Sequence, residues 1–240
     1  MSNVSKGSII GPLTRAVLLT ILCWPGLPAV LSAQPTTHLK RPLVEIRTEL
    51  GNMVVALYNE TPVHRDNFLK LVRTGAYDSL LFHRIVPGFA IEGGDPTSKF
   101  AEPGERLGQV TDTLGIPLEV IPGLIHKKGA LSAAPAGETR EFTGLSHRSR
   151  FFIVQGTPYT AEELTEVAER NANLGTPFTY TDEDRSEYST FGGQPRLDGG
   201  YTVFGEVLEG LEVIDALAKQ PCNAWDRPLK DIRMFIRTLE

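Results

Sequence analysis

The sequence predicts a mainly β protein, in which one β-rich domain follows an N-terminal leader, and three observations support this prediction. The 240-residue chain holds 23 glycines and 17 prolines, which favour many turns over long helices. Hydrophobic residues make up 41% of the chain and charged residues 22%, so the chain can bury a proper core. Residues 43–58 show the alternation of a β-hairpin. All-β barrels often reach this length as one domain.

The hairpin is indicated by two alternating runs on either side of one turn. Side chains that favour strands recur at every second position of residues 44–48 and again of residues 53–57. Gly51-Asn52, between the two runs, is a turn signal. We therefore expect two antiparallel strands joined at this turn.

Three helices are predicted from the signals at their ends. Thr61-Pro62 offers an N-cap and a proline at the first helical position, and Gly75 is a natural C-terminal stop. Residues 160–163 read Thr-Ala-Glu-Glu, a capping-box arrangement that predicts a helix ending near residues 174–175. The third helix is expected over residues 209–219.

The first 33 residues have the character of a secretory signal peptide. Lys6 and Arg15 supply a basic start, residues 16–31 form a short apolar run, and small residues lead out of it. We therefore expect residues 1–33 to be removed, residues 34–42 to form a linker, and the protein to be periplasmic or secreted. The alternative is an uncleaved N-terminal membrane anchor, which the short, proline-containing run disfavours.

The charge balance is acidic and bears on possible partners. Removing residues 1–33 takes away two cations and no acids, so the net charge changes from −5 to −7. This argues against nucleic acid as a partner, because nucleic-acid binding calls for a basic patch, and it gives no sign of membrane contact after signal removal. Cys222 is the single cysteine of the mature chain, which excludes an internal disulfide, and we interpret it as a bystander.

Residues 157–193 are predicted to form an acidic helical insertion on the surface. The segment holds eight acids and only two cations, Arg170 and Arg185, which gives it a net charge of −6. Its apolar content is too low for a core of its own, so we do not expect a second domain. A solvated helical excursion is the simpler interpretation, and a docking site for a protein partner is the alternative.

Residues 82–96, FHRIVPGFAIEGGDP, are the most informative stretch. Alternation along a strand places Arg84 near Phe89, so a cation lies beside an apolar surface. A strand–turn–strand with an ordinary surface arginine would give the same spacing, and the residues alone leave both interpretations open. His83 is interpreted as a core histidine and Gly93-Gly94 as a turn.

This stretch resembles the signature segment of the cyclophilins, which commonly carry FHR, then PGF, then QGGD at these spacings. Residues 149–154 (SRFFIV) are similar to the SQFFI strand of that family, and residues 197–207 (LDGGYTVFGEV) to its WLDG-x-H/Y-VVFG segment. The motifs stand in family order, and the resemblance covers residues 43–240 except the insertion. It implies a closed, eight-stranded antiparallel barrel capped by helices, with the substrate proline bound on its outer face.

The resemblance also implies a peptidyl-prolyl cis/trans isomerase that uses no metal or cofactor and acts on proline-containing polypeptides. By matching position, Arg84 is the expected catalytic residue. Phe89, Phe152 and Leu197 are expected to form the apolar seat of the proline ring. The full set of expected substrate-binding residues is Phe89, Ala90, Glu92, Ala134, Ala136, Arg150, Phe152, Leu197 and Tyr201.

Several of these positions depart from the family pattern. Ala90 replaces the usual methionine, which widens the pocket, and Pro135 stands at the place of a loop asparagine. Arg196 stands where tryptophan is common, and Tyr201 where histidine is frequent. We expect these changes to alter the shape of the pocket.

Glu92 and Arg150 replace two neutral glutamines of the family and carry opposite charges. We expect them to pair with each other, which would balance the local charge and leave Arg84 free. The alternative is that both side chains point to solvent.

The sequence therefore predicts an isomerase that assists the folding of secreted proteins, for which uncatalysed X–Pro isomerisation takes tens to hundreds of seconds. The alternative is a proline-binding, chaperone-like module with weak or no isomerase activity. The altered pocket residues support that alternative.

Overall fold

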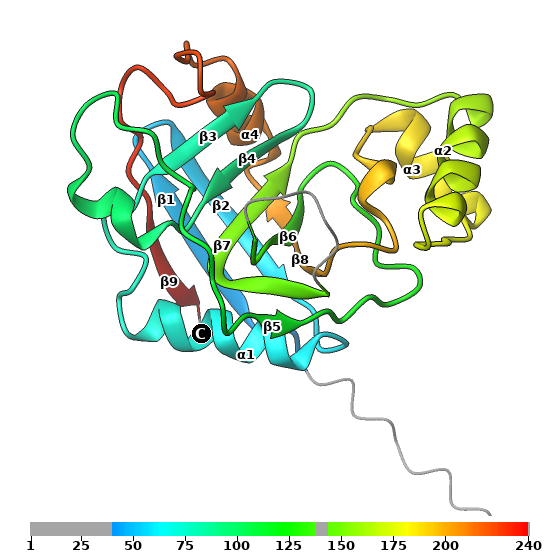
Figure 1. Cartoon of the computed structure of the whole chain (residues 1–240), viewed down its shortest axis with the longest axis horizontal. Coiled ribbons are helices and arrows are strands. Elements are labelled where there is room, and N and C mark those ends of the chain that lie inside the picture. Colours follow the sequence, from blue (N-terminus) through cyan, green and yellow to red (C-terminus); the bar gives the residue numbers. More distant parts are fainter. Residues whose placement is uncertain (1–39, 138–143, 240) are drawn as a thin grey trace, which may run out of the picture. The chain divides into compact units, whose positions relative to one another are not determined.

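The computed structural model describes residues 40–137 and 144–239 (Figure 1). The segment predicted as a signal peptide, residues 1–33, lies outside the described residues, as does most of the predicted linker. Within the described ranges, every helix is too short or too polar to cross a membrane.

Strands make up the centre of the structure, and helices lie at its ends and in the insertion. The helices are α1 (Pro62–Arg73), α2 (Ala161–Asn173), α3 (Asp182–Thr190) and α4 (Leu211–Ala218), with 3-10 turns η1 (Pro96–Phe100) and η2 (Pro195–Leu197). The strands are β1 (Leu43–Thr48), β2 (Gly51–Leu57), β3 (Phe82–Val86), β4 (Ala90–Gly93), β5 (Ile116–Pro117), β6 (Ala130–Pro135), β7 (Leu145–Val154), β8 (Val203–Glu209) and β9 (Phe235–Leu239).

The strands form one antiparallel sheet in the order β3-β4-β7-β6-β8-β2-β1-β9, and β5 pairs with β7 beside this path. The predicted antiparallel pairing is confirmed, because β1 and β2 pair with Val44 opposite Val55 and Thr48 opposite Gly51. The turn lies at Glu49-Leu50, two residues before the predicted position, and Gly51-Asn52 belong to β2. The eight strands of the path match the predicted number. The mainly β class and the antiparallel arrangement are therefore confirmed.

The sheet is a curled half-barrel, and the closed barrel that we predicted is not confirmed. The path has two ends, β3 and β9, which do not pair as strands within the described residues. The backbone next to them does meet, through an isolated bridge between Leu81 and Arg233 and a 2.9 Å hydrogen bond from Phe82 N–H to the carbonyl of Ile232.

The main hydrophobic core fills the inside of the curled sheet. Alternate side chains of β1 and β2, among them Val44, Ile46, Met53 and Val55, are fully buried there. Helix α1 packs against β7, β8 and β9, and α4 packs against β2, β3 and β4. Figure 1 shows the two helices at opposite ends of the sheet.

Helix α1 begins at Pro62 as predicted, but the Thr61 side chain does not cap it. The carboxylate of Glu119 accepts the N–H groups of Val63 (3.1 Å) and His64 (2.9 Å) instead. The Thr61 hydroxyl is buried with no hydrogen-bond partner in the described structure. A residue distant in sequence thus supplies the cap that Thr61 was predicted to provide.

The insertion is more ordered than the sequence predicted. Helix α2 carries the predicted capping box between Thr160 and Glu163, and α3 is a further helix with its own box. The segment does contribute buried apolar side chains, because Leu164, Tyr180 and Tyr188 form a small cluster that it shares with Ile125 of the preceding loop.

The two ends of the insertion meet at a narrow neck. Gly193 N–H donates to the carbonyl of Thr157 at 3.1 Å, and Gly193 also forms a bridge with Lys127. The backbones pack so closely that a Cβ on Gly156 would lie 2.4 Å from the Cα of Gly193. The insertion therefore leaves and rejoins the sheet at one point.

Candidate active site on the outer face of the sheet

Strand register places the predicted site residues in one row across the sheet. Arg84 of β3 lies opposite Glu92 of β4, and Glu92 lies opposite Phe152 of β7. Because side chains alternate along a strand, Phe151 and Ile153 point into the main core while Phe152 points to the outer face. The outer face thus carries an arginine, a carboxylate and an aromatic ring side by side.

The Arg84 guanidinium is held by two carboxylates. Its Nη1 lies 3.2 Å from Glu92 Oε2, and its Nη2 lies 3.3 Å from Asp226 Oδ2. About a third of the arginine side chain remains exposed, which leaves it open to a ligand. The two ion pairs fix the orientation of the fork without burying it.

A cavity of about 640 Å³ opens over this row and gathers most of the predicted site. Six of the predicted residues line it: Arg84, Phe89, Glu92, Phe152, Leu197 and Tyr201. The other described residues of its wall are Pro135, Arg170, Leu174, Gln194 and Arg196.

The three predicted alanines do not line this cavity. Ala90 and Ala134 are buried beneath the wall, packed in a cluster with Phe152 and Val203. Ala136 is also buried, and its carbonyl accepts the N–H of Asp112 at 2.8 Å. Ala90 and Ala134 support the aromatic surface from below, and Ala136 takes part in a backbone contact.

The predicted pair between Glu92 and Arg150 is wrong. Register sets Glu92 directly opposite Arg84, and the two form an ion pair. Arg150 is buried, and its guanidinium donates to the carbonyls of Gly108 (2.5 Å) and Pro135 (3.1 Å). Arg150 is thus absent from the cavity wall and holds Pro135, which does line the cavity.

The structure also shows the roles of two other residues of this stretch, His83 and Gly94. His83 is a core histidine as predicted, since it is buried and burial lowers the pKa of its ring. Gly94 has a φ of 84°, and a Cβ there would lie 2.2 Å from the carbonyl oxygen of Ser149. Only glycine fits that approach of two backbones.

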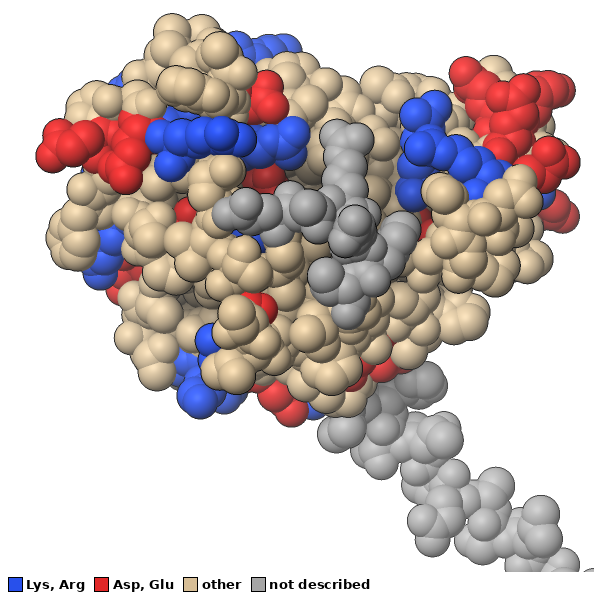
Figure 2. All heavy atoms as spheres, viewed as in Figure 1, with Lys and Arg blue, Asp and Glu red and all other residues tan. Residues whose placement is uncertain are grey.

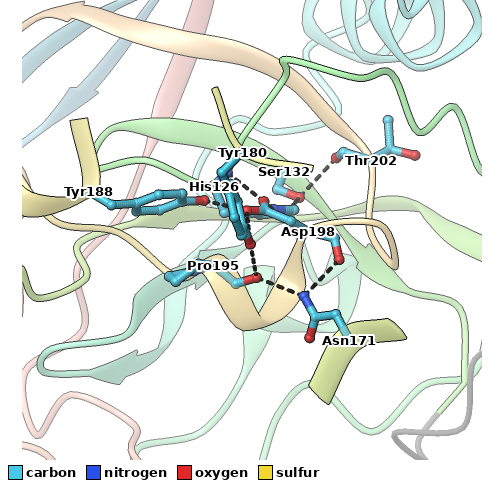
Figure 3. A network of polar contacts seen from close by, with 8 residues as sticks. All are labelled: His126, Ser132, Asn171, Tyr180, Tyr188, Pro195, Asp198 and Thr202. Atoms are coloured by element: carbon cyan, nitrogen blue, oxygen red, sulfur yellow. Dashed lines mark hydrogen bonds and ion pairs between the residues drawn. The ribbon is translucent and has the colours of Figure 1, made fainter. Parts of the chain in front are cut away.

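A buried polar network lies behind the wall and joins the insertion to the sheet (Figure 3). Asp198 Oδ1 is 2.7 Å from His126 Nδ1, and Asp198 Oδ2 accepts the hydroxyls of Tyr180 (3.0 Å) and Tyr188 (2.5 Å). Burial and the charge of Asp198 raise the pKa of both tyrosines, so their hydroxyls remain donors. His126 Nε2 reaches Ser132 Oγ at 3.0 Å. All of these residues are buried, so the network is structural.

Sequence reasoning missed the contribution of the insertion to the wall. Arg170 lies in the last turn of α2, Leu174 is the C-cap of this helix, and Gln194 follows the neck. The available signal was Arg170, one of only two cations in an acidic segment. Among the described residues, no group of three or more His, Cys, Asp or Glu side chains is placed to hold a metal ion.

The fold and the site define a β-sheet protein whose outer face offers an apolar seat beside an oriented arginine. The family model of the cyclophilin type peptidyl-prolyl cis-trans isomerase/CLD matches residues 43–237. The chain belongs to this family.

Relatives agree with this assignment. A Streptococcus pyogenes protein, provisionally named a bifunctional phosphatase/peptidyl-prolyl cis-trans isomerase, is 34% identical over 204 residues, which span 83% of this chain but only 38% of that protein. A Staphylococcus haemolyticus protein, provisionally named a peptidyl-prolyl cis-trans isomerase, is 30% identical over 79% of this chain and 86% of its own length.

Solved structures share the fold. A Cryptosporidium parvum cyclophilin type peptidyl-prolyl cis-trans isomerase superposes with a TM-score of 0.58 at 23% identity, covering 83% of this chain and 98% of its own. A structure of the same protein in the presence of the dipeptide Ala-Pro gives a TM-score of 0.56 at 24% identity, covering 82% and 99% of the two chains.

Proposed function

We propose that the cavity on the outer face binds a proline of a polypeptide substrate and isomerises the X–Pro bond before it. The observation that carries this proposal is that Arg84 and the apolar seat, formed by Phe89, Phe152 and Leu197, line the same cavity. Its volume lies in the range of small-ligand sites. Arg84 acts as the catalytic residue and the seat holds the ring.

The chemistry needs few groups. Rotation about a peptide bond meets a barrier of about 18–20 kcal/mol, which arises from amide resonance. In the twisted state the prolyl nitrogen becomes pyramidal and accepts a hydrogen bond that the planar amide cannot. A guanidinium donor aimed at this nitrogen stabilises the twisted state more than either planar state. A 10⁴-fold acceleration corresponds to about 5.5 kcal/mol of such stabilisation.

The environment of Arg84 supports this role. A guanidinium carries five N–H donors in a rigid fork, and the pairs with Glu92 and Asp226 leave several of them free. The two carboxylates fix the plane of the fork before the substrate arrives. An oriented donor loses less freedom in the twisted state than a mobile one.

The apolar seat is also rigid. The Phe152 ring is 5% exposed, stacks on His126 with centroids 6.0 Å apart, and meets the edge of Tyr201 at 6.3 Å. A fixed surface of this kind grips the proline ring while the chain on the other side of the bond rotates.

One experiment separates the proposed isomerase from a proline-binding module that lacks turnover. The protein is mixed with a short peptide that contains one Ala–Pro bond. Exchange between the cis and trans forms of this bond is followed by NMR exchange spectroscopy, which needs no coupled protease. We expect exchange to accelerate well beyond the uncatalysed rate of the peptide. Saturable binding with unchanged exchange would instead identify the binding module, whose support is the set of pocket residues that depart from the family pattern, among them Pro135 and Arg196.

The finer expectations about cellular role are also proposals. The basic and apolar character of residues 1–33 supports a signal peptide, a periplasmic or secreted location and a role in folding secreted proteins. The contacts between Leu81 and Arg233 and between Phe82 and Ile232 support closure of the half-barrel into a barrel. The acids on α2 and α3 support a docking face for a protein partner.

A further inference from the structure

Among the described residues, three arginines and one carboxylate line the cavity. The arginines are Arg84, Arg170 and Arg196, and the carboxylate is Glu92. Arg84 pairs with Glu92 and also with Asp226, which lies outside the cavity wall, whereas Arg170 and Arg196 have no ion pair within the described residues. The cavity is therefore electropositive in a chain whose net charge is −5. Two cations of its wall therefore have no carboxylate partner among the residues that the structure describes.

Arg170 reaches the cavity because of where α2 ends. The helix stops at the C-cap Leu174, and Gly175 follows with a φ of 80°. The Leu174 side chain is 56% exposed although the residue is apolar, and it lines the cavity instead of packing in the core of the insertion. The C-terminal end of α2, with its C-cap, thus offers a substrate both an apolar and a cationic contact.

Acidic and basic side chains lie on different sides of the insertion. Figure 2 shows acidic side chains gathered over the outer side of the insertion and basic side chains on the side nearer the sheet. Glu162 and Glu163 lie in the first turn of α2, and Arg170 lies in its last turn. An acidic segment therefore presents a cation to the cavity.

Arg170 and Arg196 are held on two elements that are tied together. Asn171 is buried, and its side-chain amide donates to the carbonyls of Pro195 (3.0 Å) and Asp198 (3.2 Å). These bonds fix the last turn of α2 against η2, which carries Arg196. The two cations thus lie on a rigid frame.

We propose that the insertion is a specificity element that selects polypeptides carrying an acidic side chain close to the proline, with Arg170 and Arg196 as the groups that bind the carboxylate. The proposal rests on the proposed function, since it concerns the substrate of the same cavity. A guanidinium binds a carboxylate through paired hydrogen bonds, and an unpaired arginine repels a lysine at the same place.

A merely structural role for Arg170 makes a different prediction. A cation in the last turn of a helix stabilises the helix dipole, so loss of Arg170 would lower the stability of α2. That role would change the rate for acidic, neutral and basic peptides alike. Selection by charge changes the ratio between them.

The experiment compares peptides that share one Ala–Pro bond and carry Glu, Gln or Lys at one flanking position at a time. Exchange rates and dissociation constants are measured in the same NMR titrations at low and high salt. We expect the Glu peptide to exceed the Lys peptide in kcat/KM by about fivefold to twentyfold at one position, and the ratio to shrink in high salt. In Arg170→Gln/Arg196→Gln protein the ratio should fall towards one. Arg185→Gln, which removes the other cation of the insertion outside the cavity, is the control and should keep the wild-type ratio.

The outcomes separate this inference from the proposed function. Equal rates and affinities for the Glu, Gln and Lys peptides at every position overturn the inference and leave the isomerase intact. An equal fall of the ratio in Arg185→Gln also overturns it, because long-range charge would then suffice. If no peptide is turned over, the proposed function fails, and the dissociation constants still decide the preference.

Discussion

At the scale of single residues, the site is governed by strand register. Arg84 and Glu92 are equally far from Gly88, which has a φ of 74° in the turn between β3 and β4. Residues that lie opposite each other in an antiparallel pair are close enough for an ion pair. Glu92 therefore orients Arg84 and does not compensate Arg150.

Removal of Arg84 should reduce activity without unfolding the protein. We expect Arg84→Ala to lower kcat/KM more than tenfold in a protease-free exchange assay, because the donor to the prolyl nitrogen is lost. The melting temperature should change little, since the side chain is part-exposed and lies outside the core. Arg84→Lys, which keeps the charge but loses the fork, should recover only part of the rate. A folded Arg84→Ala protein with the wild-type rate would disprove the assignment.

His147 should make stability depend on pH. The residue is 7% exposed, its Nδ1 accepts the N–H groups of Ser149 and Arg150 at 3.1 Å, and burial together with the charge of Arg150 lowers its pKa to about 4. Between the ordinary pKa of about 6.5 and this value, the unfolded chain binds a proton that the folded chain excludes. The contribution of His147 to the free energy of unfolding should therefore be fully present above pH 6.5. It should decrease by about 3 kcal/mol as the pH drops towards 4.

Urea unfolding at pH 7.5 and pH 4.5 measures this loss. His147→Asn keeps an acceptor oxygen near the position of Nδ1 and removes the titration. Other groups, among them Asp112, titrate alike in both proteins. The difference between the two proteins in how the free energy of unfolding changes with pH therefore isolates the effect of His147. Equal slopes in the two proteins would contradict the prediction.

At the scale of elements, the start of α1 shows how a cap is supplied from a distance. Glu119 accepts two backbone N–H groups of the first turn, and its carboxylate also lies 2.6 Å from His64 Nδ1. Thr61 occupies the N-cap position without using its hydroxyl. The stability of α1 thus depends on the loop that carries Glu119.

This arrangement reverses the usual effect of N-cap mutations. Thr→Ala at an N-cap usually costs about 1 kcal/mol. Here Thr61→Val should be neutral or stabilising, because it removes a buried hydroxyl that lacks a partner. Glu119→Ala should lower the free energy of unfolding by about 1–3 kcal/mol, since three contacts are lost. Chemical denaturation of both variants tests these two predictions. A larger loss in the free energy of unfolding for Thr61→Val than for Glu119→Ala would refute them.

The sequence predicted the elements whose signals lie within a few neighbouring residues. The capping box of α2 joins residues three apart, and the hairpin of β1 and β2 joins neighbouring runs, so both could be read directly. Helix α3 was missed because polar residues follow its box and no apolar stripe marks it. The Glu119 cap joins residues more than 50 positions apart, which no local pattern reveals.

The residues of the candidate site also fall into those that a local motif predicted and those that only tertiary packing brings to the cavity. Arg84, Phe89 and Phe152 were predicted from motifs within single segments, and all three line the cavity. The symmetry of Arg84 and Glu92 about the turn also indicates their pairing, whereas the opposite charges of Glu92 and Arg150 wrongly predicted a pair between those two residues. Arg170 and Leu174 reach the wall only through the tertiary packing of the insertion, so the sequence marked Arg170 as an unusual cation but not its place in the wall.

At the scale of the described domain, the insertion and the sheet share a buried carboxylate. Asp198 follows η2 and accepts hydroxyls from Tyr180 and Tyr188 of the insertion as well as groups of His126. A buried charge is stable only when its hydrogen bonds are satisfied. The tyrosines therefore contribute to the stability of the neighbouring sheet.

Loss of one tyrosine hydroxyl should destabilise the domain. Tyr188→Phe leaves Asp198 with fewer donors in a buried site, and we expect a loss of about 1–3 kcal/mol in the free energy of unfolding. Tyr159→Phe, at a half-buried ring that contacts Tyr188 edge to face, is the matched control and should change stability by less than about 0.5 kcal/mol. Thermal and urea denaturation measure both. Similar losses in the two variants would show that the Asp198 contact is not the cause.

The neck of the insertion has a consequence for how this chain can vary. Side chains are barred at Gly156, where a Cβ would meet the opposite backbone at 2.4 Å, and at Gly193, where it would meet the His126 carbonyl at 2.4 Å. Beyond the neck, added length costs little, because closure entropy rises only slowly with the number of residues in a loop. Evolution can therefore lengthen or recharge the outer part of the insertion, and so retune which substrates enter, while the two glycines at its base and the two tyrosines that bind Asp198 stay fixed.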